Sequence, residues 1–332
     1  MATRRAVLGI AALLVCCALA SQIPAPAVVP VAGAQAARAY VIARNGQVQV
    51  LDTRTGGVLS RDDTGAWTTG AAVSADGRRV YVVNGWAGDI TAVEPGAGVV
   101  GRIDTGAQLA QAVLQPGGKR LYVTGSGLVA VVELEPFRVV ATARVGRQPQ
   151  GVAVSPDGEE LYVANAQDGT VSVLDTKSAT VITTVEVGGL PQQVAVSPDG
   201  GLVYVSSLHL GDKPGAITAI DAKTRRAVWS MPVGKGAGSV AVTPDGRRVY
   251  VALDGAVAVV DTATGTTSTL DLAAKSLAIP PGDRRVFLAC GKTTTLLDSA
   301  DDSVLATFHL TGLNSDGRGF EATTVAFQPV AD

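Results

Sequence analysis

The chain has 332 residues, of which 47% are hydrophobic and only 17% are charged, so it can bury a large core within a single domain. Its two histidines and three cysteines are too few and too scattered to supply the ligand sets of haem or structural zinc, and we expect no cofactor. A formal net charge of −2 argues against general nucleic-acid binding.

The N-terminus has the arrangement of a secretory signal. A basic start precedes an apolar run at residues 6–20 that ends in small residues. We therefore predict a signal peptide at 1–20, a Pro/Ala-rich tether at 21–37 and a folded body at 38–332. This predicts a secreted or extracytoplasmic protein, in the periplasm or at the cell surface. If the signal is not cleaved, it would serve as a membrane anchor.

A phrase of about a dozen residues then recurs with a period near 40 residues. Its best preserved copy runs from Val154 to Asn165, and related copies occupy 73–84, 196–205 and 242–251. The aromatic residue of the phrase occurs seven times, 37 to 46 residues apart, as Tyr40, Tyr81, Tyr122, Tyr162, Tyr204, Tyr250 and Phe287. Self-similarity at such a period indicates a repeat protein.

Each copy predicts four short strands. In the best preserved copy these are residues 151–155, 161–165, 171–175 and 181–187, which are rich in Val, Ile, Thr and Tyr and are bounded by Gly, Pro, Asp and Asn. A Pro-Asp-Gly sequence joins the first two strands, and its proline, aspartate and glycine each favour a tight turn. The first two strands therefore form a hairpin.

The third strand of most copies ends on an aspartate. These third-strand aspartates are Asp52, Asp175, Asp221, Asp261 and Asp298. A carboxylate at a strand end can accept backbone N–H groups of the following turn. We therefore interpret them as structural rather than catalytic residues.

Four antiparallel strands per repeat are typical of a propeller blade. Residues 40–60 supply only the second, third and fourth strands of a blade, and residues 324–329 supply a first strand without partners. We predict an all-β fold: a seven-bladed β-propeller of four-stranded antiparallel blades, closed by N- and C-terminal strands that share one blade. Removal of the last residues should then be unusually costly.

The repeats resemble those of the YVTN family of bacterial exported β-propellers, from about residue 40 to residue 329. The resemblance implies a seven-bladed ring whose ligands bind around the central channel, on the face formed by the loops between second and third strands and between successive blades. The chain departs from the pattern at 115–118 and replaces the asparagine of Asn165 by Leu253 and Cys290 in two other copies. These changes argue against a ring of essential asparagines.

On that face, the residues entering the first strands are mostly Gly, Gln, Ser and Thr, with no acidic ring to hold calcium or another metal. His209 lies in the loop 207–215, which is longer than its equivalents. Exposed tryptophans beside glutamines and a few charges suit a sugar, peptide or protein partner. The predicted ligand-binding residues are Trp67, Trp86, Gln111, Gln150, Gln193, His209, Lys213 and Lys275.

Three functions remain open. The leading hypothesis is a monomeric, exported, non-catalytic binding module for a protein, peptide or glycan. Lactonase propellers are similar in fold and suggest instead a hydrolase of cyclic esters, with His209 as base, Glu321 orienting it and Arg318 stabilising the oxyanion. The chain lacks the His-Pro-rich motifs of that family.

The third hypothesis is single-stranded DNA binding, as in some periplasmic relatives of this repeat family. It would need aromatic rings for base stacking among basic residues. The residues available for it are Trp86, Lys213, Lys235, Lys275 and Lys292.

Overall fold

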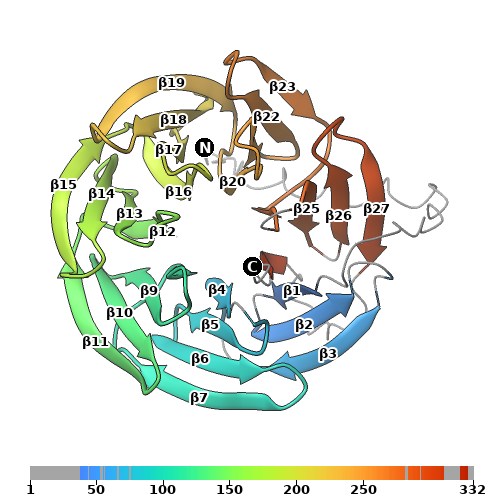
Figure 1. Ribbon diagram of the computed structural model, residues 1–332. Coiled ribbons are helices and arrows are strands. Elements are labelled where there is room, and N and C mark those ends of the chain that lie inside the picture. Colours follow the sequence, from blue (N-terminus) through green and yellow to red (C-terminus); the bar gives the residue numbers. More distant parts are fainter. Residues whose placement is uncertain are drawn as a thin grey trace, which may run out of the picture.

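The computed structural model describes residues 38–43, 45–52, 55, 57–65, 67–74, 76–280, 283–291 and 293–309, and the backbone of 322–327. Strands β1 to β28 form seven four-stranded antiparallel sheets. The sheets are arranged radially around a central axis (Figure 1). The predicted seven-bladed propeller is therefore confirmed. The predicted signal peptide and tether lie outside the described residues.

We number the blades along the chain. Blade 1 contains β28 (Ala322–Phe327), β1 (Arg38–Ala43), β2 (Gln47–Asp52) and β3 (Val58–Asp63). Blade 2 contains β4 (Gly70–Val73), β5 (Val80–Asn84), β6 (Asp89–Glu94) and β7 (Gly98–Asp104). Blade 3 contains β8 (Ala112–Leu114), β9 (Arg120–Gly125), β10 (Leu128–Leu134) and β11 (Phe137–Arg144). Blade 4 contains β12 (Pro149–Val154), β13 (Glu160–Asn165), β14 (Thr170–Asp175) and β15 (Thr180–Glu186).

The remaining blades follow the same order. Blade 5 contains β16 (Leu190–Val196), β17 (Leu202–Leu208), β18 (Gly215–Asp221) and β19 (Arg226–Gly234). Blade 6 contains β20 (Val240–Val242), β21 (Arg248–Ala252), β22 (Val257–Asp261) and β23 (Thr267–Leu270). Blade 7 contains β24 (Ser276–Ala278), β25 (Arg285–Cys290), β26 (Thr293–Asp298) and β27 (Val304–His309).

The two ends of the chain close the ring. Strand β28 pairs antiparallel with β1, with Tyr40 opposite Ala326 and Val41 opposite Val325. The shared blade is therefore confirmed, although the closing strand covers 322–327 rather than 324–329. Closure gives β1 a partner along each edge, as the second strand has in the other blades.

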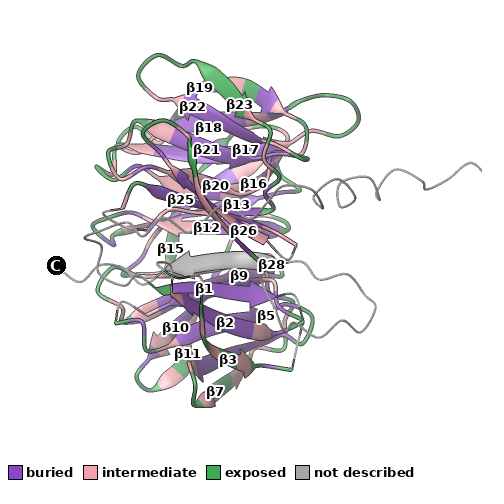
Figure 2. Cartoon of the chain, turned by 90° about the vertical axis from the view of Figure 1, so that its right-hand side faces the viewer, coloured by how far each residue is buried: buried purple, intermediate pink, exposed green. Residues whose placement is uncertain are grey.

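The core consists of apolar layers between neighbouring blades. Five of the repeated tyrosines and Phe287 are among the largest fully buried side chains, and Tyr81 is also buried. Tyr162, for example, packs in one cluster with Val194 and Val205 of the next blade. The second and third strands are buried along nearly their whole length, whereas the outermost strands are more exposed (Figure 2). Some apolar side chains of the outermost strands, such as Val228, face solvent. Inter-blade burial of these apolar side chains stabilises the ring.

The third-strand aspartates cap the turns that follow them. Each accepts a backbone N–H through Oδ1, at 2.6 Å from Ser178 to Asp175 and at 2.7 Å from Thr224 to Asp221. The same bond is present at Asp52, Asp261 and Asp298. Their structural role, expected from the sequence, is confirmed.

The Pro-Asp-Gly hairpin turns also form as expected. In blade 4, the Ser155 hydroxyl donates to Asp157 Oδ1 at 2.5 Å, and the Glu159 N–H donates to the same oxygen at 3.0 Å. These bonds, the serine hydroxyl first, hold the pKa of Asp157 below its usual value. Gly158 supplies the positive φ of 76° that the turn requires.

No helix with the length and apolar character of a membrane span occurs in the described part of the chain.

Candidate functional site

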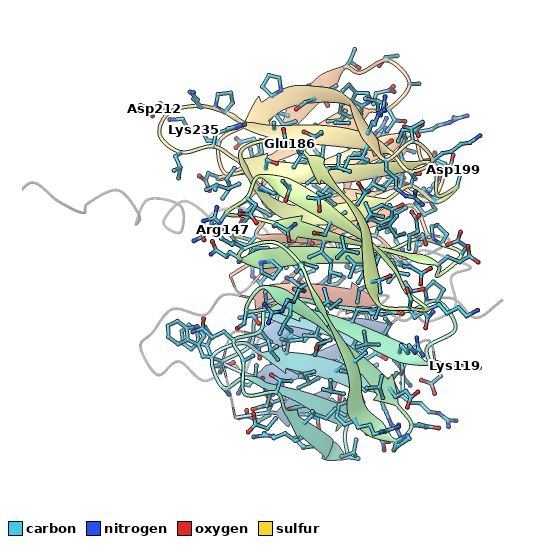
Figure 3. All side chains as sticks on the ribbon, turned by 90° about the vertical axis from the view of Figure 1, so that its left-hand side faces the viewer. Lys119, Arg147, Glu186, Asp199, Asp212 and Lys235 are labelled. Atoms are coloured by element: carbon cyan, nitrogen blue, oxygen red, sulfur yellow. The ribbon has the colours of Figure 1, made fainter. Side chains whose placement is uncertain are left out.

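We call the face that carries the connections between second and third strands, and between successive blades, the upper face; the opposite face is the lower face. Arg147, Asp212 and Lys235 lie at one side of the ring and Lys119 and Asp199 at the other (Figure 3). The first three belong to upper-face connections and the last two to lower-face hairpin turns. The two faces therefore carry different sets of loops.

A cavity of about 330 Å³ opens in the channel, where the first strands of blades 3 to 7 converge. We call it the channel mouth. Its polar lining residues include Gln111, Gln150, Gln192, Gln193, Ser239 and Lys275. The apolar residues between them, such as Val152 and Val194, belong to the same first strands. The mouth is thus formed by equivalent positions of successive repeats.

Glycines allow the first strands to approach one another closely. A Cβ atom on Gly151 would lie 2.1 Å from Gln193 Oε1 and 2.5 Å from Gln193 Cα, in the next blade. At Gly70 the corresponding distances to Gln111 are 2.9 Å and 3.0 Å. A side chain at either glycine would collide with the neighbouring blade, so these positions set the width of the mouth.

The amides of the mouth are only partly used by the protein. Gln192 Nε2 donates to the Leu190 carbonyl at 2.8 Å, and Gln193 Oε1 accepts from the Val194 N–H at 3.2 Å. Among the described residues, neither the Gln150 amide nor the Lys275 ammonium has a side-chain hydrogen bond or ion pair. Donors and acceptors therefore remain available to a ligand.

The chemistry of the mouth is that of neutral hydrogen bonding. Amides and hydroxyls dominate its lining, Lys275 is its one charged residue, and none of its lining residues is His, Cys, Asp or Glu. In the described ranges, no group of three His, Cys, Asp or Glu residues is placed to hold a metal ion. The mouth therefore offers no acid–base pair for catalysis among its described residues.

Four of the eight predicted ligand-binding residues meet in this mouth: Gln111, Gln150, Gln193 and Lys275. The other four lie on upper-face connections outside its lining. Trp67 is in the β3–β4 connection and Trp86 in the β5–β6 connection, with 48% and 76% of their surfaces exposed. His209 and Lys213 share the β17–β18 connection.

The predicted hydrolase triad is not assembled by the described residues. His209 Nδ1 lies 2.9 Å from the carbonyl oxygen of Pro214, so this ring nitrogen holds its own loop together. Glu321 and Arg318 lie outside the described residues, as does Lys292 of the DNA-binding hypothesis. Lys235, another residue of that hypothesis, pairs with Asp212 at 2.7 Å.

Sequence reasoning missed a larger cavity on the lower face. It has a volume of about 700 Å³ and lies between blades 2 and 3, with Tyr81, Arg79 and Lys119 in its lining. The departure from the repeat at 115–118 was the signal that could have located it, because Gly117 and Gly118 also line this cavity.

Two solved structures resemble the chain in fold. One, titled Kuenenia stuttgartiensis hydrazine synthase, has a TM-score of 0.69 and 21% identity over 79% of this chain and 90% of that chain. The other is a functionally unknown protein from Desulfotomaculum acetoxidans DSM 771, with a TM-score of 0.72 and 16% identity over 88% of this chain and 99% of that chain. No family model matches the chain, and no curated protein matches its sequence. The likeness supports the β-propeller fold alone, and the YVTN resemblance stays a prediction.

Proposed function

We propose that the protein is an exported, non-catalytic binding module whose channel mouth binds a neutral carbohydrate. The observation that carries this proposal is the convergence of four glutamines and two serines in one cavity whose lining includes no acidic residue or histidine. A glutamine amide both donates and accepts hydrogen bonds, and a sugar hydroxyl does the same. Such a lining matches many neutral hydroxyls better than it matches an ionic group.

The size of the mouth agrees with a small ligand segment. Its volume of about 330 Å³ is at the lower end of the range of about 300–1,000 Å³ that is usual for ligand pockets. Trp67 and Trp86 expose aromatic surface on the same face, which is suited to contact with the apolar side of a sugar ring outside the mouth. Carbohydrates outside the cytoplasm would be accessible to a protein that carries the predicted signal at 1–20.

Binding of soluble neutral saccharides, measured by isothermal titration calorimetry, tests this function. Gln150→Leu replaces an amide of the mouth by an apolar side chain of similar size. We expect it to weaken binding by about tenfold, the cost of roughly one hydrogen bond. Gln167→Leu is the matched control, because Gln167 is exposed in the β13–β14 connection outside the mouth. The proposal fails if no saccharide binds, or if short peptides bind instead. It also fails if both variants bind as well as the parent.

Export has its own test. The signal at 1–20 predicts that the protein is recovered outside the cytoplasm with a new N-terminus close to residue 21. N-terminal sequencing of the fractionated protein measures this directly. An intact N-terminus in the cytoplasmic fraction would contradict the predicted localisation and leave the binding proposal to be judged by calorimetry.

A further inference from the structure

The lower-face cavity between blades 2 and 3 shares no lining residue with the channel mouth. We call it the lower pocket. Besides Tyr81 and Leu134, its lining contains seven charged residues: Asp76, Arg78, Arg79, Glu94, Lys119, Glu133 and Glu135. They come from blades 2 and 3 and from the connections of those blades. Other blade junctions differ from it in the charged residues that contact the repeated tyrosine.

At the junction of blades 4 and 5, an ion pair covers the repeated tyrosine. The Tyr162 hydroxyl donates to Glu160 Oε2 at 2.5 Å, and Arg225 Nη2 of the next blade reaches Glu160 Oε1 at 2.6 Å. Arg225 belongs to the turn between the third and fourth strands of blade 5. The charged turn residue therefore closes the space above the buried ring.

The junction of blades 6 and 7 is closed by the same principle with the charges exchanged. Asp302, in the turn between β26 and β27, accepts a bond from the Tyr250 hydroxyl at 2.5 Å. Arg248 of blade 6 donates to the same carboxylate at 3.0 Å. At both junctions, a charged turn residue of the following blade pairs with an opposite charge beside the tyrosine. The turn residue is Arg225 in one case and Asp302 in the other.

The junction of blades 2 and 3 has only a weak form of this closure because its turns differ. Glu135, in the β10–β11 turn, reaches Arg79 only at 3.5 Å, and its side chain is 85% exposed. Only residues 135–136 join β10 and β11, whereas residues 222–225 and 299–303 form the equivalent turns of blades 5 and 7. Blade 3 also has Gly117 where blade 4 has Asp157, so its hairpin turn contributes no side chain there. The result is a cavity of about 700 Å³ above Tyr81.

The acidic residues around the lower pocket are also exceptions to the repeat. Blades 2 and 3 carry Glu94 and Glu133 where the other blades have third-strand aspartates. Glu94 Oε1 accepts from Arg79 Nε at 3.2 Å, and Glu133 pairs with Arg138 at 3.4 Å. Both carboxylates therefore contact side chains instead of capping a turn. Three kinds of departure from the repeat converge on one cavity.

The charges of the lower pocket do not cancel locally. Arg79 is shared between Glu94 and Glu135, with the second contact at 3.5 Å, so two carboxylates share one guanidinium. The Glu135 side chain is 85% exposed. Lys119 makes no ion pair with any described residue. Asp76 and Arg78, which also line the pocket, pair with each other at 4.0 Å. One negative charge, from Glu94 and Glu135 together, and the positive charge of Lys119 are therefore left for a ligand to neutralise.

We propose that the lower pocket binds a dipeptide with free ends. The ammonium group of the ligand lies beside Glu135 and Glu94, and its carboxylate lies beside Lys119. Leu134 and the Tyr81 ring supply apolar surface for the rest of the ligand. A volume of about 700 Å³ lies well within the usual range of about 300–1,000 Å³ for pockets that bind small molecules.

Calorimetry with a set of unblocked dipeptides tests the site, and the tightest member is measured again in its N-acetylated and C-amidated forms. We expect each block to weaken binding at least tenfold. Lys119→Met should cause a similar loss of affinity, and this variant should bind the amidated and the unblocked dipeptide equally well. Glu135→Gln should bind the acetylated and the unblocked dipeptide equally well. This double-mutant logic pairs each end of the ligand with one residue. Both residues line an open cavity, and circular dichroism verifies that the variants are folded.

Matched controls separate the lower pocket from the general charge of its face. Lys223→Met and Glu159→Gln change the same charges at exposed positions in lower-face turns of blades 5 and 4, and they should leave binding unchanged. Gln150→Leu in the channel mouth should also leave it unchanged. The proposal is overturned if no dipeptide binds, if blocked dipeptides bind equally well, or if a diamine such as putrescine binds with the same dependence on Glu135 and none on Lys119.

Discussion

Two junctions of the ring contain an equivalent buried tyrosine but differ in the charged residues that surround its hydroxyl group. Between blades 4 and 5, the Tyr162 hydroxyl donates to Glu160, which forms an ion pair with Arg225 of the next blade. Between blades 2 and 3, Tyr81 is equally buried in an inter-blade cluster, yet a cavity opens above it. The apolar layer is therefore independent of the charged layer that covers it. A repeat protein can shorten one turn to open a pocket without losing the core beneath it.

The largest effect should come from opening the ring, on which both junctions depend. A chain that ends at residue 321 lacks β28 and leaves the edge of β1 without a partner. We expect a loss of more than about 5 kcal/mol, comparable with the total stability of many domains, and hence no cooperative thermal transition. Circular dichroism measures this, and a chain that ends at 327 is the control. A transition within a few degrees of the parent would show that closure contributes little.

The next largest effect tests whether the two junctions share one core. Tyr81→Ala and Tyr162→Ala each remove a buried ring that is at most 2% exposed. Each should lower the free energy of unfolding by about 3–5 kcal/mol through lost burial and the cavity left behind. Chemical denaturation gives both values. A cost at Tyr81 of less than about half that at Tyr162 would mean that the open junction is also loosely packed.

A smaller effect should distinguish the charged layers. Arg225→Ala removes the guanidinium that pairs with Glu160, whose side chain is only 20% exposed, and should cost about 1–2 kcal/mol. Glu135→Gln at the open junction alters a carboxylate that is 85% exposed and should change stability by less than about 0.5 kcal/mol. Denaturant midpoints compare the two. Equal costs would contradict the assignment of Glu135 to ligand binding rather than to stability.

The smallest effect concerns acid. The Ser155 hydroxyl and the Glu159 N–H depress the pKa of Asp157, so this carboxylate stabilises the fold above its unfolded pKa of about 3.9. That contribution is lost as the pH falls through the lower pKa of the folded state. Denaturant midpoints between pH 7 and 2 should fall less steeply below pH 4 for Asp157→Asn than for the parent. The turn at Gly117 has no such carboxylate. Gly118→Ala in that turn should therefore leave the fall of the denaturant midpoint between pH 7 and pH 2 the same as in the parent.

The regular part of the architecture was determined by the sequence alone. The Pro-Asp-Gly turns and the third-strand aspartates make contacts within one hairpin, which depend on neighbours in the chain. The recurring aromatic residue marks the period of the repeat, although its ring packs against the next blade. The closing strand was also predicted, to within two residues at each end, because an incomplete blade at one terminus requires a strand from the other. Local patterns repeated at a constant period were therefore sufficient for the fold.

Only the tertiary structure decided where ligands have room. Gln111, Gln150, Gln193 and Lys275 converge because equivalent first strands point into one channel, whereas Trp86 lies on an exposed loop outside it. The lower pocket depends on the length of the β10–β11 turn relative to residues of another blade. The lower pocket forms where the turns of two neighbouring blades, about 40 residues apart in the chain, do not fill the space between them. A local sequence pattern does not show how much of that space the two turns fill.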